Sequence, residues 1–319
     1  MDYMNEKNNY YEETFFDLSK IIQSIIKKKY LIILVTSAFA VASIFYSLSL
    51  PNMYESNTKL KLTEDSSPSS ALSSITSQFG GLANLVGVSV PGGQGSTKAN
   101  YAIELMKSKE FIKHINSFPG ITEKLIATKS IDKVSGEIVY DNELYDSEKK
   151  QWVRKPPPGR DLVPSYLEVH KEVMKSLDIT MSKKTGFISI SFKHESPLFA
   201  YEFINLITSE INKITKKQDL AQSESSLEYL YAQLQKVSEK DVRDSINKLI
   251  EVQLNTNMLA NLKDDYLLGP IDPSFVPEVK SGPRRSIICI IGTLIGFLLS
   301  IFYVLSGHLF NNKKNSYLT

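Results

Sequence analysis

Signatures of catalysis and metal binding are scarce in this 319-residue sequence, which has one cysteine, four histidines and one tryptophan. The histidines are His114, His170, His194 and His308. None lies four residues from another and none has a cysteine neighbour, so the sequence lacks the spacing of a zinc site. The sequence also has no Gly-x-Ser-x-Gly nucleophile motif. We therefore predict a protein that is not an enzyme and that uses no metal and no other cofactor.

The single cysteine excludes a disulfide within the chain. Cys289 lies in an apolar run near the C-terminus, so the polar part of the chain must be stabilised by core packing and subunit contacts. The segment GGQGSTK, from Gly92 to Lys98, contains the residue types of a phosphate loop but not their G-x-x-x-x-G-K-[S/T] order. Nucleotide binding is therefore not expected.

An excess of positive charge is also missing. The net formal charge is +2, and residues 51–285 carry 30 Lys plus Arg and 30 Asp plus Glu. A protein that binds nucleic acid presents a basic surface to the phosphate backbone. We therefore predict no nucleic-acid partner.

What the sequence does contain is two uncharged apolar runs, residues 30–50 and 287–305. Each is long enough, at about 1.5 Å per residue, to cross the ~30 Å hydrocarbon core of a membrane as a helix. A cleaved signal peptide is the alternative for the first run. That run is longer than the usual ~7 to 15 apolar residues, and five acidic residues precede it. We therefore predict two transmembrane helices.

Basic residues at the ends of these runs predict the orientation. Lys27, Lys28 and Lys29 directly precede the first run, whereas Arg284 and Arg285 precede the second and argue the other way. The first helix usually dominates, and long loops cross regardless of charge. We expect a bacterial inner-membrane protein with a cytoplasmic N-terminal segment (1–29), a short cytoplasmic tail (306–319) and a periplasmic domain (51–286).

The periplasmic domain is predicted to mix helices and strands, so the fold class is an α+β membrane protein. Alternation of apolar and polar residues predicts strands at Tyr54 to Leu62 and at Gly186 to His194. The other expected elements are a flexible Ser/Gly-rich stretch from Ser66 to Ser96, helices from Ala102 to Ile115 and from Tyr166 to Leu177, and two short strands between Glu137 and Arg154.

A long helical arm is predicted at about residues 197–262, because the 71 residues between Pro197 and Gly269 include neither glycine nor proline. A helix from Leu198 to about Val237 would reach roughly 60 Å. Ser238 and Asp241 then resemble the start of a returning helix. Sparse apolar residues on the arm are expected to contact neighbouring copies: Phe203, Ile207, Ile211, Leu230 and Leu234. A coiled coil without a partner is the alternative.

A proline-rich connector is predicted at residues 269–283, between the arm and the second apolar run. It contains Pro270, Pro273, Pro277 and Pro283. Proline lacks a backbone N–H and biases the preceding residue toward extended geometry. The connector should therefore be stiff and couple the second span to the domain.

Small residues four apart in the two spans indicate a helix contact. The pairs are Ala38 with Ala42 and Gly292 with Gly296, which forms a G-x-x-x-G pattern. Such pairs let helix backbones approach closely. The contact could be within the protomer or with another membrane protein.

Several segments resemble the Wzz family of O-antigen chain-length determinants. They are DLSKIIQSIIKKKYLI, MYESNTKLKL, YDNELYDSEKKQWVRKPPPG, KKTGFISISFKHESPLFAYEFINLI and DVRDSINKLIEVQLNTNMLANLKDDYLLGPIDPSFVPEVKSGPRR. The resemblance covers most of the chain apart from the Ser-rich insert. The family's VIDP-x-x-VP signature is met by PIDPSFVP from Pro270 to Pro277, although Gly269 and Pro270 replace the usual apolar pair.

The resemblance implies an α/β base near the membrane, a long periplasmic arm and a ring-shaped homo-oligomer. It also implies partners, namely a Wzy-type polymerase and the undecaprenyl-diphosphate-linked polysaccharide that this polymerase extends. The expected function is to set the modal chain length of the polymer. Related capsule proteins add a cytoplasmic kinase after the second span, and this sequence resembles the kinase-free branch.

Two alternatives remain open at this stage. One is a co-polymerase for exopolysaccharide or capsule, which shares the architecture. The other is a two-span receptor, which would need a cytoplasmic output domain that the tail from Ser306 to Thr319 is too short to form.

Overall fold

The computed structural model describes residues 26–63, 94–132, 135–262 and 265–316. The chain divides into two compact units, Met1–Pro51 with Gly282–Thr319 and Asn52–Ser281, and each is described by itself. Most of the predicted Ser/Gly-rich stretch, Ser66 to Ser96, lies outside the described residues.

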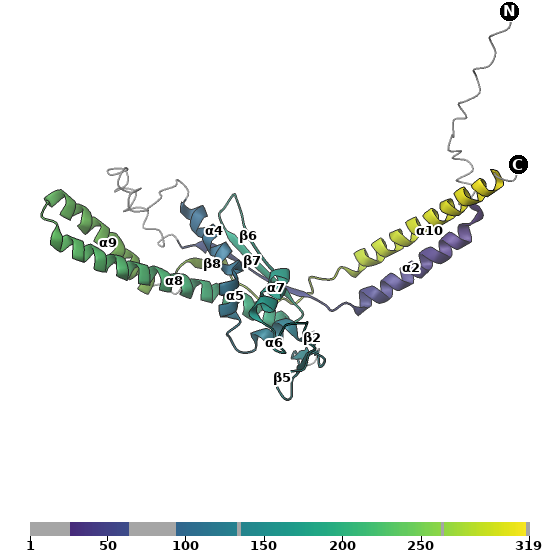
Figure 1. Cartoon of the computed structure of the whole chain (residues 1–319), viewed down its shortest axis with the longest axis horizontal. Helices are drawn as coiled ribbons and strands as arrows, with labels where there is room; N and C mark the ends of the chain where they lie inside the picture. The colour runs from purple at the N-terminus through teal and green to yellow at the C-terminus, as the bar shows by residue number, and fades with distance from the viewer. Residues whose placement is uncertain (1–25, 64–93, 133–134, 263–264, 317–319) are drawn as a thin grey trace, which may run out of the picture. The chain divides into compact units, whose positions relative to one another are not determined.

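The first unit is a pair of long apolar helices, α2 (Lys29–Ser49) and α10 (Arg285–Ser316), which pack side by side (Figure 1). Their most apolar windows have mean hydropathies of 2.2 and 2.6, so both helices are long and apolar enough to cross a membrane. The two helices predicted at residues 30–50 and 287–305 are therefore present.

The second unit is built on a four-stranded antiparallel sheet in the order β6 (Leu177–Met181), β7 (Ile188–His194), β1 (Tyr54–Leu62) and β8 (Leu268–Asp272). The predicted strands at β1 and β7 are confirmed, whereas β6 was not predicted. The first and last strands of the unit are neighbours in the sheet, with Leu60 opposite Pro270. The chain therefore enters and leaves the sheet on adjacent strands.

Helix α8 (Pro197–Lys236) begins at the Ser196 cap, with proline in its first turn, where its missing N–H costs no hydrogen bond. Its first half packs on the sheet, where the rings of Phe203 and Phe192 lie 4.3 Å apart between centroids. Phe203, Ile207 and Ile211 are 0% exposed. The prediction that these three residues contact neighbouring copies is therefore wrong, because they fill the core of their own protomer.

Four further helices complete this core: α4 (Gln94–Lys107), α5 (Lys109–Ile115), α6 (Ile121–Ile126) and α7 (Tyr166–Ser176). The single helix predicted from Ala102 to Ile115 is divided at Ser108. The Ser108 backbone is extended, and its hydroxyl accepts a hydrogen bond from the N–H of Phe111 at 3.2 Å. Ser108 therefore caps α5 rather than continuing α4.

Two small hairpins lie at the edge of the core. Strand β2 (Thr128–Ile131) pairs with β3 (Ile138–Tyr140), and β4 (Tyr145–Asp146) pairs with β5 (Gln151–Trp152). The region from Glu137 to Arg154 therefore contains three strands rather than the predicted two. The only tryptophan, Trp152, packs edge-on against the ring of Tyr145 at 5.2 Å.

The second half of α8 and helix α9 (Lys240–Leu262) form a helical hairpin, which is the arm (Figure 1). The Ser223 hydroxyl donates to the Gln253 carbonyl at 2.8 Å and links the two helices. At the turn, the Arg243 guanidinium donates to the Leu234 and Val237 carbonyls, both at 3.0 Å. Arg243 thus satisfies carbonyls at the C-terminus of α8, and the predicted return helix is confirmed.

Candidate functional site: the connector and its attachment to helix α8

Hydroxyl groups of β1 hold the proline-rich connector. Ser56 and Thr58 occupy buried positions of this strand, where apolar residues are the rule. Their hydroxyls donate to the carbonyls of Phe275 and Asp272, each at 2.8 Å. The prolines of the connector cannot donate to a strand ladder, so side chains of β1 supply part of the missing attachment.

Asn212 of α8 fixes the chain where the connector enters the sheet. Its side-chain amide donates to the Leu268 carbonyl at 2.9 Å and accepts the N–H groups of Leu267 and Leu268 at 3.0 and 2.8 Å. The residue is 3% exposed. One buried side chain therefore satisfies three backbone groups, each of which would be costly to bury unpaired.

Three polar residues of α8, spaced seven apart, form what we call the connector seam: Asn205, Asn212 and Asp219. Seven residues are nearly two helical turns, so all three lie on one face. Asn205 accepts the Ser274 hydroxyl at 2.8 Å, and Asp219 accepts the Tyr266 hydroxyl at 2.7 Å. The seam ties residues 266–274 along the axis of the helix that continues into the arm.

The environment of Tyr266 strengthens the seam. Burial raises the pKa of the Tyr266 phenol, and the hydrogen bond to the Asp219 carboxylate raises it further. The phenol therefore stays protonated and remains a donor throughout the physiological pH range.

The predicted connector prolines are divided between the two units. Pro270, Pro273 and Pro277 belong to the second unit, whereas Pro283 belongs to the first. Within the second unit, the end of the connector returns to the start of β1, because Ser281 N–H donates to the Met53 carbonyl at 2.8 Å.

In the helix pair, the glycines of α10 face α2 of the same chain. A Cβ atom added to Gly292 would lie 2.5 Å from Ser43 Cβ, and one added to Gly296 would lie 2.5 Å from Phe39 Cβ. The glycines thus make a contact within the protomer. Ala38 and Ala42 are exposed and do not take part, because Phe39 and Ser43 lie on the face of α2 that meets α10.

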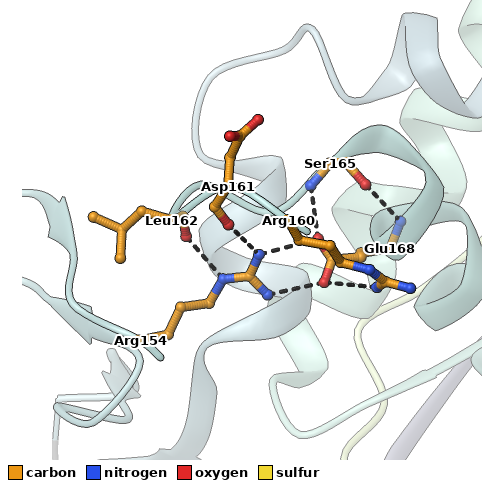
Figure 2. A network of polar contacts seen from close by, with 6 residues as sticks. All are labelled: Arg154, Arg160, Asp161, Leu162, Ser165 and Glu168. Atoms are coloured by element: carbon orange, nitrogen blue, oxygen red, sulfur yellow. Dashed lines mark hydrogen bonds and ion pairs between the residues drawn. The ribbon is translucent and has the colours of Figure 1, made fainter. Parts of the chain in front are cut away.

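A buried ion pair orders the loop before α7 (Figure 2). The Arg154 guanidinium donates to both carboxylate oxygens of Glu168 at 3.0 Å, and to the backbone carbonyls of Leu162 and Asp161 at 2.8 and 3.0 Å. Arg154 is 9% exposed. A bidentate pair of this kind combines charge with fixed geometry, so it pins the loop to the helix.

Glu168 is held by two further groups. Arg160 lies 3.0 Å from one carboxylate oxygen, and the other accepts the Ser165 N–H at 3.0 Å within a capping box. The hydrogen bonds from Arg154, together with those from Ser165 and Arg160, lower the pKa of Glu168 to about 2. The carboxylate is therefore ionised at any physiological pH.

The histidines whose side chains the structure describes each make a hydrogen bond within the fold. His114 Nε2 lies 2.8 Å from Glu210, His170 Nε2 lies 3.0 Å from the Lys107 carbonyl, and His194 Nε2 lies 2.9 Å from the Lys124 carbonyl. Among the described residues, no group of three or more His, Cys, Asp or Glu side chains could hold a metal ion.

Sequence reasoning missed the residues of the seam. Asn205, Asn212 and Asp219 recur at a constant spacing of seven residues on α8, and this regularity was the available signal. Ser56 and Thr58 carried no signal, because hydroxyl residues are common in strands whether or not they bind a neighbouring segment.

Comparison with known proteins adds one family match. Residues 14–116 match the family model Wzz, described as chain length determinant protein. These residues are similar to the Wzz family. This segment includes α2, β1, α4 and α5, so it contains the first apolar helix and the strand whose hydroxyls hold the connector. The predicted resemblance to Wzz proteins is thereby confirmed over these residues.

One solved structure that resembles this chain is described as a full-length bacterial polysaccharide co-polymerase. It shares 12% sequence identity and has a TM-score of 0.40, over 93% of this chain and 99% of that chain. A TM-score this low does not establish a common fold. Comparison with curated proteins found no match.

Proposed function

We propose that this chain regulates the modal length of lipopolysaccharide O-antigen made by the Wzy-dependent pathway. The observation that carries the proposal is the Wzz match over residues 14–116, which includes the first apolar helix. A second such helix, α10, lies near the other end of the chain. Chain-length determinants are non-enzymatic regulators, so no active site is required.

In the proposed arrangement, α2 and α10 span the bacterial inner membrane with both termini in the cytoplasm. Residues 51–286 then form the periplasmic domain, with the sheet as its base and the α8–α9 hairpin as its arm. The lysines before α2 support this orientation, since basic residues favour the cytoplasmic side.

The protein is proposed to act as a homo-oligomer, a ring of parallel arms beside the Wzy-type polymerase. The arm supports this because it exposes several large apolar side chains: Tyr229, Tyr231, Leu254, Met258 and Leu262. Leu230 and Leu234 are half-buried and remain proposed contacts between copies. Neighbouring arms would cover this surface and bias when the polymerase releases the undecaprenyl-linked polysaccharide.

The test is a gel of lipopolysaccharide from cells with and without the protein. We expect a modal band of long chains in the parent cells, and a ladder that declines steadily with length after deletion. An unchanged ladder together with loss of secreted polymer would instead assign the chain to exopolysaccharide or capsule polymerisation and export.

A further inference from the structure

A groove of about 510 Å³ lies beside the connector seam, between α8, β1 and residues 265–274. Its volume is in the range of sites that bind small molecules, roughly 300 to 1,000 Å³. Neither the Wzz match nor the proposed scaffold role assigns a ligand to it.

One wall of the groove is a row of hydrogen-bonding side chains on α8. Asn205, Thr208 and Ser209 line it at spacings of three and four residues, which places them on one face of the helix. Among the described residues, the Thr208 hydroxyl is buried without a partner, and neither the Ser209 hydroxyl nor the Asn205 amide nitrogen has a hydrogen bond. This wall therefore offers both donors and acceptors to a ligand.

The lining outside α8 includes an apolar part, formed by the exposed rings of Pro270 and Pro273 over the buried side chain of Leu60. Thr58, Asp265 and Ser274 complete this side of the groove. The groove thus combines aliphatic C–H surface on one side with hydroxyl and amide groups on the other.

Charge in the groove is close to balanced. Lys213 and Lys216 line the groove together with Asp265, and the Lys213 ammonium lies 2.7 Å from the Glu210 carboxylate, so two positive charges stand beside two negative ones. An anion such as phosphate would gain little net attraction where the local charge is balanced. The groove is suited to a ligand that is polar but uncharged.

A peptide is a poor fit at this edge of the sheet. An extended peptide would bind by pairing with the free edge of β8, but Pro270 and the following Pro273 have no N–H to donate. The main-chain ladder that gives such complexes their affinity cannot form here.

We propose that this groove binds a short segment of uncharged polysaccharide, with sugar hydroxyls on Asn205, Thr208 and Ser209 and sugar C–H faces on Pro270 and Pro273. The choice of a saccharide rests on the proposed function. The site would place the polymer against the seam that ties the connector to the arm helix.

The experiment is isothermal titration of the detergent-solubilised full chain with O-polysaccharide released by mild acid from the lipopolysaccharide of the cells that make it. Ser209→Trp fills the groove from an exposed helix position and should raise the Kd at least 10-fold. Ser225→Trp, on an exposed position of the same helix outside the groove, should leave the Kd within twofold.

Thr208→Val is a second, nearly isosteric variant that removes only the unpartnered hydroxyl. We expect it to raise the Kd about fivefold, and its unchanged tryptophan fluorescence would show that the fold is intact. Equal binding by wild type and Ser209→Trp would overturn the proposal, as would absence of binding to the wild type or displacement of the polysaccharide by inorganic phosphate.

Failure of the groove proposal is distinct from failure of the length-regulation proposal. A deletion that collapses the modal band while the purified chain binds no polysaccharide would leave length control standing without this site. The opposite result is a purified chain that binds polysaccharide, loses binding in Ser209→Trp, and comes from cells whose ladder is unaffected by deletion. It would establish a saccharide site without length control.

Discussion

His194 is a buried histidine whose two ring nitrogens have different partners. The Ser196 N–H donates to Nδ1 at 3.0 Å, so Nδ1 is the acceptor and Nε2 carries the proton toward the Lys124 carbonyl. The ring stacks on Phe192 and meets Phe199 edge-on. Burial lowers the pKa of His194 to about 4, since a second proton would replace the Ser196 bond and place charge in the core.

This environment predicts acid destabilisation at moderate pH. The unfolded chain takes up the proton near pH 6.5, whereas the folded chain does so only near pH 4. Stability is therefore unaffected by His194 above pH 6.5 and should fall by about 3 kcal/mol between pH 6.5 and 4. Urea unfolding of wild type and His194→Gln across this range tests it. The free energy of unfolding of His194→Gln should depend much less on pH than that of the wild type. Parallel curves of unfolding free energy against pH for the two proteins would contradict the role given to His194.

The ion pair between Arg154 and Glu168 predicts a stability loss when the carboxylate is removed. Glu168→Gln leaves the buried Arg154 guanidinium without its charge partner, so we expect roughly 2 kcal/mol of destabilisation. Trp152, the only tryptophan, lies two residues from Arg154 and reports unfolding by fluorescence. Glu172→Gln, which removes an exposed pair with Lys175, is the matched control and should cost under about 0.5 kcal/mol. Equal effects of the two variants would show that the ion pair between Arg154 and Glu168 is not stabilising.

At the scale of single residues, the sequence predicts the hydrogen-bond partner of a side chain only when the two residues are close in the chain. Ser165 and Glu168 follow the spacing of a capping box, which local physics specifies. Arg154 reaches the same carboxylate across a loop that contains three consecutive prolines, and no periodic pattern indicates that contact. The same holds for Asn212, whose partners lie 55 and 56 residues away.

At the scale of elements, the seam predicts that one α8 side chain anchors β8. Asn212→Ala would leave three backbone groups of Leu267 and Leu268 buried without partners, so we expect a loss of roughly 3 kcal/mol. Asn205→Ala is the control. Its partner, the Ser274 hydroxyl, can turn to water, and the cost should stay below about 1 kcal/mol. Chemical unfolding measures both variants, and a cost for Asn212→Ala no larger than that for Asn205→Ala would refute the anchoring role.

The helix pair predicts an asymmetry between its small residues. Gly296→Leu would force a side chain into Phe39 Cβ and separate α2 from α10, so the detergent-solubilised chain should unfold roughly 5 °C lower. Ala38→Leu places the same side chain at an exposed position and should change the unfolding temperature little. If Ala38→Leu were the more damaging change, the observed pairing of the helices would be wrong.

Elements with a strong internal pattern were predictable. Ile188, Ile190 and Phe192 alternate with polar residues and are all 0% exposed in β7. The long α8 followed from the absence of glycine and proline. The surface that the apolar face of α8 contacts could not be predicted, because the spacing of Phe203 and Ile207 is the same whether they face a neighbouring copy or the protomer's own sheet. Only tertiary structure decides which surface covers an apolar stripe.

At the scale of the whole molecule, the chain connects the two units at two points, before β1 and after β8. Strand β1 follows the first apolar helix and β8 precedes the second, and the two strands pair within the sheet. The connector seam of Asn205, Asn212 and Asp219 then attaches the residues around β8 to the helix that forms the arm.

The most direct test of length regulation is to measure chain length and sugar composition together, in lipopolysaccharide from parent and deletion cells. We predict the same repeat-unit sugars in both, with the modal distribution lost after deletion and restored by the wild-type chain. A change in the sugars themselves with an unaltered length distribution would contradict the proposal, because it would show that the protein acts in making the repeat unit rather than in setting how many are joined.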